Sequence, residues 1–231
     1  MEEDLWNWSV KVVSDHIVAI AIMVVIFVII LGIASALAAG IGSIIGLAYA
    51  VAGAYATLVF IGLVWAFMIG WYVSSLHQAF MHGYSKRKIN YVDAVVEGFR
   101  YLVRRREVLA LLIGLGILAG LAEIPFAANP ATGIIGQIIG GAILAMAAAI
   151  ALLMLALRTE KADFKALGRI NALSPEAGLF LYAIILIRIV PSGLGALLQF
   201  LGMPIAVAIL VLYAMRHGAR HDRHSHSSNA A

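Results

Sequence analysis

The feature that most constrains this chain is an uncharged run of about 70 residues, from His16 to Ser85, without Asp, Glu, Lys or Arg. One membrane-spanning helix needs about 20 consecutive apolar residues, so the run predicts more than one crossing. Of the whole sequence, 63% is hydrophobic and 12% is charged, about half the charged share of an ordinary soluble domain. We therefore expect an all-α, polytopic transmembrane helical bundle.

The basic residues gather beside the apolar segments. Of the 16 Lys and Arg residues, seven lie between residues 86 and 106, four between 158 and 169, and three between 216 and 223. Positive charge next to membrane spans favours the cytoplasmic side. The distribution predicts a cell-membrane protein with both linkers and both termini in the cytoplasm. Because these residues flank apolar segments, we expect no nucleic-acid partner.

These signals divide the chain into about six spans, arranged as three hairpins with amphipathic cytoplasmic linkers. The expected spans are 17–37, 55–80, 108–126, 134–157, 175–190 and 194–215. Residues 39–57 admit three structures: an outer loop with a partly inserted segment, the first half of a long kinked helix, or an extra span. We favour two spans before the first linker, because the other four pair into hairpins. Residues 1–215 would form a single domain and 216–231 a disordered, basic, His-rich tail.

The first linker has the pattern of an amphipathic helix on the membrane surface. Apolar side chains recur there at helical spacing from Val92 to Leu102. One interpretation is a topogenic linker with a solvated basic face, and the other is a contact surface for anionic lipid headgroups or an acidic partner. The basic residues concerned are Lys86, Arg87, Lys88, Arg100, Arg104, Arg105 and Arg106.

This junction resembles that of a known group of proteins. The apolar segment Met68–Tyr84, a short basic turn and the sequence INYVDAVVEGFRYLVRR precede another apolar hairpin. The pattern is similar to uncharacterised polytopic proteins allied to the glycerophosphodiester phosphodiesterase membrane domain. The likeness covers about residues 10–215 in outline, and its specific part is 83–106. It implies a helical membrane fold and no activity, because the catalytic domain attached in some relatives does not occur in this sequence.

Two charged residues fall at membrane depth. Glu123 and Arg188 lie near the outer ends of the third and fifth expected spans, close to Pro125 and Pro191. Ionisable residues inside spans usually face the bundle interior and pair with each other, and they often mark a functional site. We expect an intramembrane ion pair. It would be either a structural contact, with each side chain reaching toward the interface, or part of a substrate path.

The remaining residue types argue against catalysis. The chain has no cysteine, and we find no nucleophile triad, phosphate-binding loop, zinc-protease motif or paired catalytic carboxylates. His77 and His82 are spaced poorly for a shared helix face, so we expect no metal site and no cofactor. Recurring glycines such as Gly116, Gly120 and Gly140 predict close helix packing in the bundle or at an oligomer interface.

Together these features predict a non-enzymatic membrane protein. The favoured function is a scaffold or accessory subunit that works through helix packing and its basic face, in contact with the bilayer and with a protein partner or further copies of itself. The alternative is a small-solute transporter or channel that uses Glu123 and Arg188. A membrane enzyme acting on lipid is a distant third.

Overall fold

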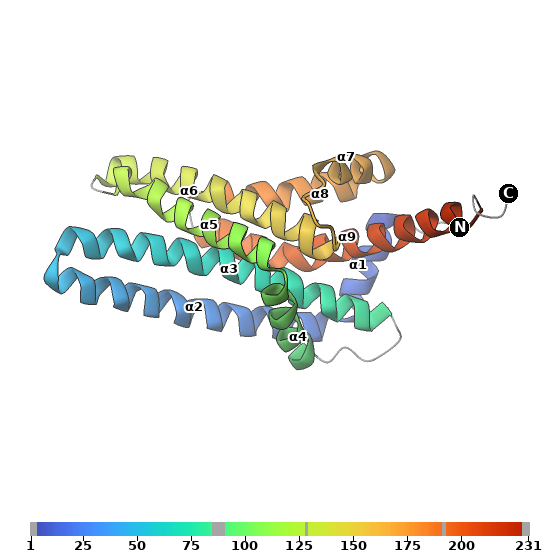
Figure 1. The fold of residues 1–231 in the computed structure, drawn as a ribbon, viewed down its shortest axis with the longest axis horizontal. Coiled ribbons are helices and arrows are strands. Elements are labelled where there is room, and N and C mark those ends of the chain that lie inside the picture. The colour runs from blue at the N-terminus through green and yellow to red at the C-terminus, as the bar shows by residue number, and fades with distance from the viewer. Residues whose placement is uncertain (1–3, 85–90, 128, 191–192, 228–231) are drawn as a thin grey trace.

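The structure, a computed structural model, describes residues 4–84, 91–127, 129–190 and 193–227, and within these residues it is helical with no strand (Figure 1). This confirms the all-α fold. The α-helices are α1 (Leu5–Asp15), α2 (Ile17–Ala48), α3 (Ala50–Tyr84), α4 (Tyr91–Arg104), α5 (Arg106–Glu123), α6 (Pro130–Ala151), α7 (Phe164–Leu173), α8 (Pro175–Leu186) and α9 (Gly193–Ser227). A π-helical turn, Leu152–Ala156, extends α6, and 3₁₀ turns follow α5 (Ile124–Phe126) and α8 (Ile187–Ile189).

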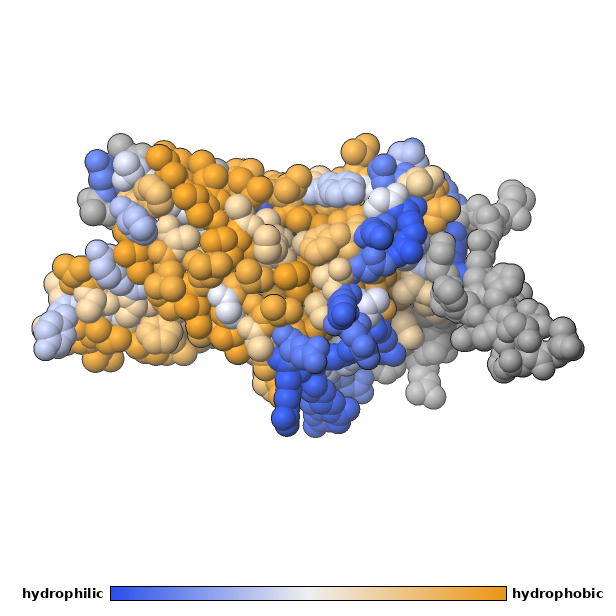
Figure 2. Space-filling model, turned by 45° about the horizontal axis from the view of Figure 1, so that its top comes forward, coloured by the Kyte–Doolittle hydropathy of each residue, from blue (hydrophilic) through white to orange (hydrophobic). Residues whose placement is uncertain are grey.

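Among the described residues, five helices are long and apolar enough to cross a membrane. They are Ile17–Ala48, Ala50–Met81, Arg106–Phe126, Thr132–Ala156 and Leu194–Arg216. Figure 2 shows a broad hydrophobic band over the bundle, with hydrophilic residues gathered toward the end where both termini lie. We call this end, formed by α1, α4, α7 and residues 157–163, the charged end, and its opposite the far end. The architecture is that of a multi-pass membrane protein.

The segment 39–57, left open by the sequence, is the turn of a long helical hairpin. Helix α2 continues to Ala48, and only Tyr49 separates it from α3. The two backbones touch, since a Cβ atom added at Gly42 would lie 2.9 Å from the carbonyl oxygen of Gly53. Glycine therefore closes the hairpin, as small residues do where membrane helices approach closely.

Helix α3 packs against α5 through glycine as well. A Cβ atom at Gly116 would lie 2.7 Å from the Cα of Leu63, and one at Gly120 would lie 2.5 Å from the carbonyl oxygen of Leu58. Real Cβ atoms do not approach backbone this closely. The expectation that glycines build the bundle is therefore met on α5.

The fifth expected span, 175–190, corresponds to α8 and the 3₁₀ turn that follows it. Helix α8 has 12 residues, a length of about 18 Å, and is not among the five long helices. Val190 is extended, with ψ 117°, because it precedes Pro191 and the residue before proline avoids the helical conformation. The helical segment therefore ends at Ile189, one residue before the expected end.

The turn between α8 and α9 reaches only part of the way along α6. A Cβ atom at Gly141 would lie 2.5 Å from the carbonyl oxygen of Arg188, and one at Gly195 would lie 2.6 Å from that of Ile187. Gly141 is about 16 Å along the helix axis from Pro130 at the far end. Accordingly, neither α8 nor α9 in Figure 1 extends as far toward the far end as α2, α3, α5 and α6 do.

The charged end contains the amphipathic linker helix. Helix α4 crosses α3 (Figure 1) and buries Ala94, Gly98 and Leu102, while Val96 and Phe99 are exposed. Its amphipathic character is thus confirmed. Helix α9 continues as helix to Ser227, through most of the expected tail, whose disorder stays a prediction.

Candidate functional site

The structure brings Glu123 and Arg188 close together beside α6. The carboxylate of Glu123 lies where a Cβ atom of Gly140 would be, and the backbone of Arg188 lies against Gly141. The two charges influence each other electrostatically. Within the described residues, however, no ion pair within 4.0 Å joins them. Glu123 and Arg188 therefore lie close to each other beside α6, but they form no direct salt bridge.

Arg188 has a different direct partner, which the sequence did not indicate. Its guanidinium carbon lies 4.4 Å from the ring centroid of Trp65 on α3, a distance typical of a cation–π contact. The Nε atom of Arg188 is buried and has no hydrogen-bond partner. Trp65 was missed because a tryptophan inside an apolar helix carries no sequence signal that separates a cation contact from ordinary packing.

A second polar cluster lies at the charged end. His77 on α3 is buried, and its Nε2 atom accepts a hydrogen bond of 2.8 Å from Nε of Arg158. The imidazole also stacks on the ring of Tyr101 on α4, with centroids 6.1 Å apart and planes 15° apart. These contacts join α3 and α4 to the segment after α6. Sequence spacing could not reveal them, since His77 and Arg158 lie 81 residues apart.

Arg105, at the corner between α4 and α5, completes this cluster. Its Nη2 atom donates to the carbonyl oxygen of Arg158 at 3.3 Å and to the hydroxyl of Tyr101 at 3.4 Å. The guanidinium carbons of Arg105 and Arg158 lie 5.6 and 5.8 Å from the Tyr101 ring centroid. Two cations thus share one aromatic ring, which connects the two cytoplasmic linkers expected from the sequence.

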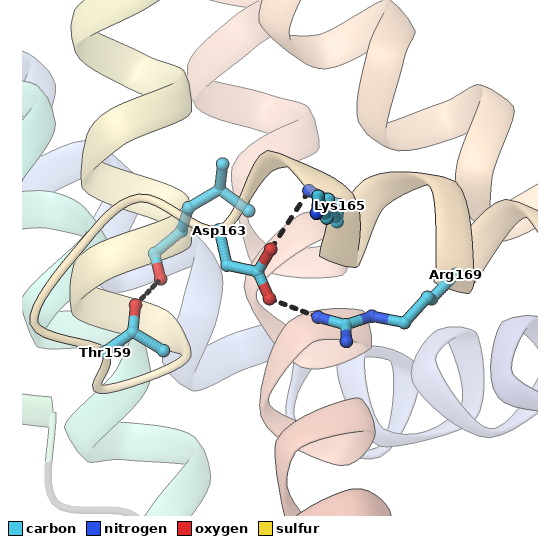
Figure 3. Close-up of polar contacts among 5 residues, drawn as sticks. Thr159, Asp163, Lys165 and Arg169 are labelled. Carbon is cyan, nitrogen blue, oxygen red and sulfur yellow. Dashed lines mark hydrogen bonds and ion pairs between the residues drawn. The ribbon is translucent and has the colours of Figure 1, made fainter.

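The segment 157–163 is held at both ends (Figure 3). Thr159 donates its hydroxyl to the carbonyl oxygen of Leu153 at 2.8 Å, and Asp163 accepts from the backbone N–H of Lys165 at 3.0 Å as the N-cap of α7. Asp163 also pairs with Arg169. Arg158 has a φ of 57°, in the left-handed region that side-chain-bearing residues rarely adopt. The segment is a fixed turn and not a loose connection.

A pocket of about 370 Å³ opens beside this turn. Its walls come from the α4–α5 corner, the π-helical turn and the segment after it, and its lining residues are Arg104, Arg105, Arg106, Glu107, Val108, Met154 and Glu160. Three of the predicted contact residues therefore gather at one cavity. Arg100 is exposed on α4 outside it, and Lys86, Arg87 and Lys88 lie outside the described residues.

No protein-family model, curated protein or solved structure matched the chain. Its function must therefore be argued from its own residues and contacts.

Proposed function

We propose that this protein is a non-enzymatic, multi-pass integral membrane protein that acts as a scaffold or accessory subunit of a membrane assembly. The observation that carries the proposal is a stripe of small residues on α2. Gly32, Ala36 and Gly40 recur every four residues and are exposed, and a Cβ atom added at Gly32 or Gly40 would meet nothing within 4 Å. We call these three residues the α2 stripe.

The α2 stripe contrasts with the glycines inside the bundle. At Gly42, Gly116 and Gly120 the neighbouring backbone fills the space that a side chain would need. Helix α2 lies at the edge of the bundle (Figure 1), and only 22% of its most apolar window is buried, against 67% for α6. The chain therefore has the small-residue surface that membrane helices use for close approach, and none of the helices that the structure describes lies on it.

The occupant that best fits the α2 stripe is a membrane-spanning helix of another subunit. The stripe is flanked by exposed apolar residues, including Ile29 at 56%, Ile33 at 58% and Leu37 at 64%. Small residues beside branched apolar ones present a shallow groove that a helix can enter over several turns. A second copy of this chain would present the same groove. The experiment below distinguishes such a homo-oligomer from a complex with another subunit.

The proposed orientation places both termini and both linkers in the cytoplasm, at the cell membrane. The positive-inside distribution supports it. Two arrangements give this result: six spans, and four spans plus an α8–α9 hairpin that turns back inside the membrane, both return the C-terminus to the side of the N-terminus. The short α8 favours the second arrangement.

The proposal is tested by purifying the full chain from native membranes in nanodiscs and measuring the mass of the proteins that copurify with it. Replacing Gly32 and Gly40 by Leu should release a stoichiometric partner, because the side chains would fill the groove. Gly114→Leu is the matched control, since Gly114 is an equally open glycine on α5. A partner retained equally by all three proteins, or a wild-type protein with no partner, would contradict the proposal. A homo-oligomer lost only in the stripe variant would assign the groove to a second copy.

The alternative function is a small-solute transporter or channel, which the position of Glu123 and Arg188 favours. Both lie beside the middle part of α6 and influence each other without a direct salt bridge, so either could exchange partners during transport. Under this alternative, Glu123→Gln should abolish solute uptake into proteoliposomes. The thermal unfolding temperature of the protein should stay unchanged. Glu176→Gln, at an exposed glutamate of α8, serves as the control. Unchanged uptake in the Glu123 variant would exclude this role.

A further inference from the structure

The pocket at the α4–α5 corner lies where the apolar span begins. Arg106 is the first residue of α5 and of its membrane-spanning window, and the pocket is bounded on its apolar side by Val108 and Met154, both buried. A pocket with apolar residues on one side and arginines on the other lies at the level of lipid headgroups. In a bilayer, that position exposes it to phosphate groups and not to the acyl chains alone.

The pocket carries charges of both signs that do not neutralise each other. Its three arginines and two glutamates surround one cavity. Across the described residues, the side chains of Arg104, Arg106, Glu107 and Glu160 form no ion pair within 4.0 Å and no hydrogen bond. Unpaired charges of opposite sign around a cavity fit a ligand that itself carries both signs.

The walls of the pocket are fixed before any ligand arrives. Arg105 bonds the backbone of Arg158 across the two linkers, and Thr159 bonds the carbonyl oxygen of Leu153. Arg158 in turn bonds the buried His77. These contacts hold the corner and the turn together, so the backbone that carries Arg104, Arg106 and Glu160 is already in place, which lowers the ordering cost of binding.

We propose that this pocket binds the headgroup of a membrane phospholipid that carries both a phosphodiester and a primary amine, such as phosphatidylethanolamine. Arg104 and Arg106 bind the phosphate oxygens, for which the guanidinium fork is suited. Glu160 and Glu107 accept hydrogen bonds from the ammonium group. A volume of about 370 Å³ falls in the range of small-ligand pockets and leaves room for such a headgroup. The inference is independent of the partner helix proposed for α2.

The test compares lipids that differ in one chemical feature. The full chain is delipidated in mild detergent, and native mass spectrometry measures adducts with phosphatidylethanolamine, phosphatidylglycerol and phosphatidylcholine of matched acyl chains. We expect phosphatidylethanolamine to be retained best, since phosphatidylglycerol has no amine and the quaternary amine of phosphatidylcholine donates no hydrogen bond. Equal retention of the three lipids would overturn the proposal.

Variants then assign the two halves of the headgroup. Arg104→Gln and Arg106→Gln should each lower phosphatidylethanolamine retention about five-fold, the effect of one basic residue near a phosphate. Glu160→Gln should lower retention of phosphatidylethanolamine but not of phosphatidylglycerol, so the preference between them should disappear. Lys165→Gln removes one exposed positive charge of α7 outside the pocket and should change nothing. A loss equal to that of Arg106→Gln would refute a site-specific role.

Soluble competitors distinguish a lipid from a free anion. Phosphoethanolamine should displace bound phosphatidylethanolamine, whereas inorganic phosphate at the same concentration should displace much less. If inorganic phosphate competes as well and the three lipids bind alike, the pocket takes a free phosphate and the lipid assignment is wrong. Thermal unfolding of each variant shows that the chain is folded. If an arginine variant does not fold, the Glu160→Gln variant, at an exposed position, still tests the proposal.

Discussion

Individual glycines in this protein face different neighbours. The neighbour decides whether an added side chain lowers the stability of the protein. Gly120 faces the backbone of α3, where a Cβ atom would lie 2.5 Å from the carbonyl oxygen of Leu58, whereas a Cβ atom at Gly114 would meet no other helix within 4 Å. Backbone cannot rotate away as a side chain can. The two residues therefore offer a matched comparison on one helix.

We predict that Gly120→Ala lowers the stability of the protein by about 1 to 3 kcal/mol, the usual cost of overpacking. Gly114→Ala should be neutral or stabilising by up to about 1 kcal/mol, because alanine favours the helix and no neighbour is displaced. Unfolding in detergent, followed by circular dichroism, measures both. Equal effects of the two substitutions would mean that α3 and α5 do not pack at Gly120 as described.

The turn after α6 is held by the hydroxyl of Thr159 on the carbonyl oxygen of Leu153. Thr159→Val keeps the shape of the side chain and removes the donor, so we predict a loss of about 1 kcal/mol. Thr159→Ser retains the donor and is the control. Should the valine and serine variants unfold at the same temperature, this hydrogen bond does not hold the turn.

At the residue scale, the sequence predicted which charged residues lie at membrane depth, but it did not predict which residues they contact. Glu123 and Arg188 stood out because charges are rare inside spans, and the fold does bring them together. Trp65, His77 and Tyr101 did not stand out, because aromatic and histidine side chains in apolar helices have many ordinary roles. Their partners depend on which helices become neighbours, which local spacing does not encode. The α2 stripe was not singled out from the sequence, because only the fold shows that its face is uncovered.

At the scale of the elements, hydropathy located the long helices and left the depth of one segment undetermined. The sequence predicted helices over the regions of α2, α3, α5, α6 and α9 because an apolar stretch of sufficient length has few alternatives in a bilayer. Hydropathy could not show how far into the membrane each helix reaches. Residues 175–190 are as apolar as a span, yet α8 has 12 residues and its last turn lies beside Gly141, part way along α6.

This arrangement predicts where a thiol can be reached. In the native cysteine-free chain, Leu194→Cys should resist a membrane-impermeant maleimide added to intact cells, because Leu194 lies in the first turn of α9, which begins part of the way along α6. Ala127→Cys, between α5 and α6 at the far end, should be labelled from outside. Labelling of both positions at similar rates would show that the α8–α9 turn reaches the outer surface and that α8 completes a crossing.

At the scale of the whole molecule, the charged end collects both termini and both linkers (Figure 1). We predict that Asp4→Cys and Arg100→Cys, both exposed, react only after the membrane is permeabilised. The physical reason is the excess of Lys and Arg on this side. Labelling of both residues in sealed cells would contradict the cytoplasmic orientation, and labelling of one alone would contradict the two crossings between them.

The central claim is that another subunit's helix lies along α2, and a photo-crosslinker placed at Ala36 tests it most directly. Ala36 is the middle of the α2 stripe and is exposed. On illumination of native membranes, we predict one discrete crosslinked product of fixed mass from Ala36, and only lipid adducts from the same crosslinker at Gly114 on α5. The product should disappear when Gly32 and Gly40 are replaced by Leu. Lipid adducts alone at Ala36, as at Gly114, would contradict the account and leave α2 facing the bilayer.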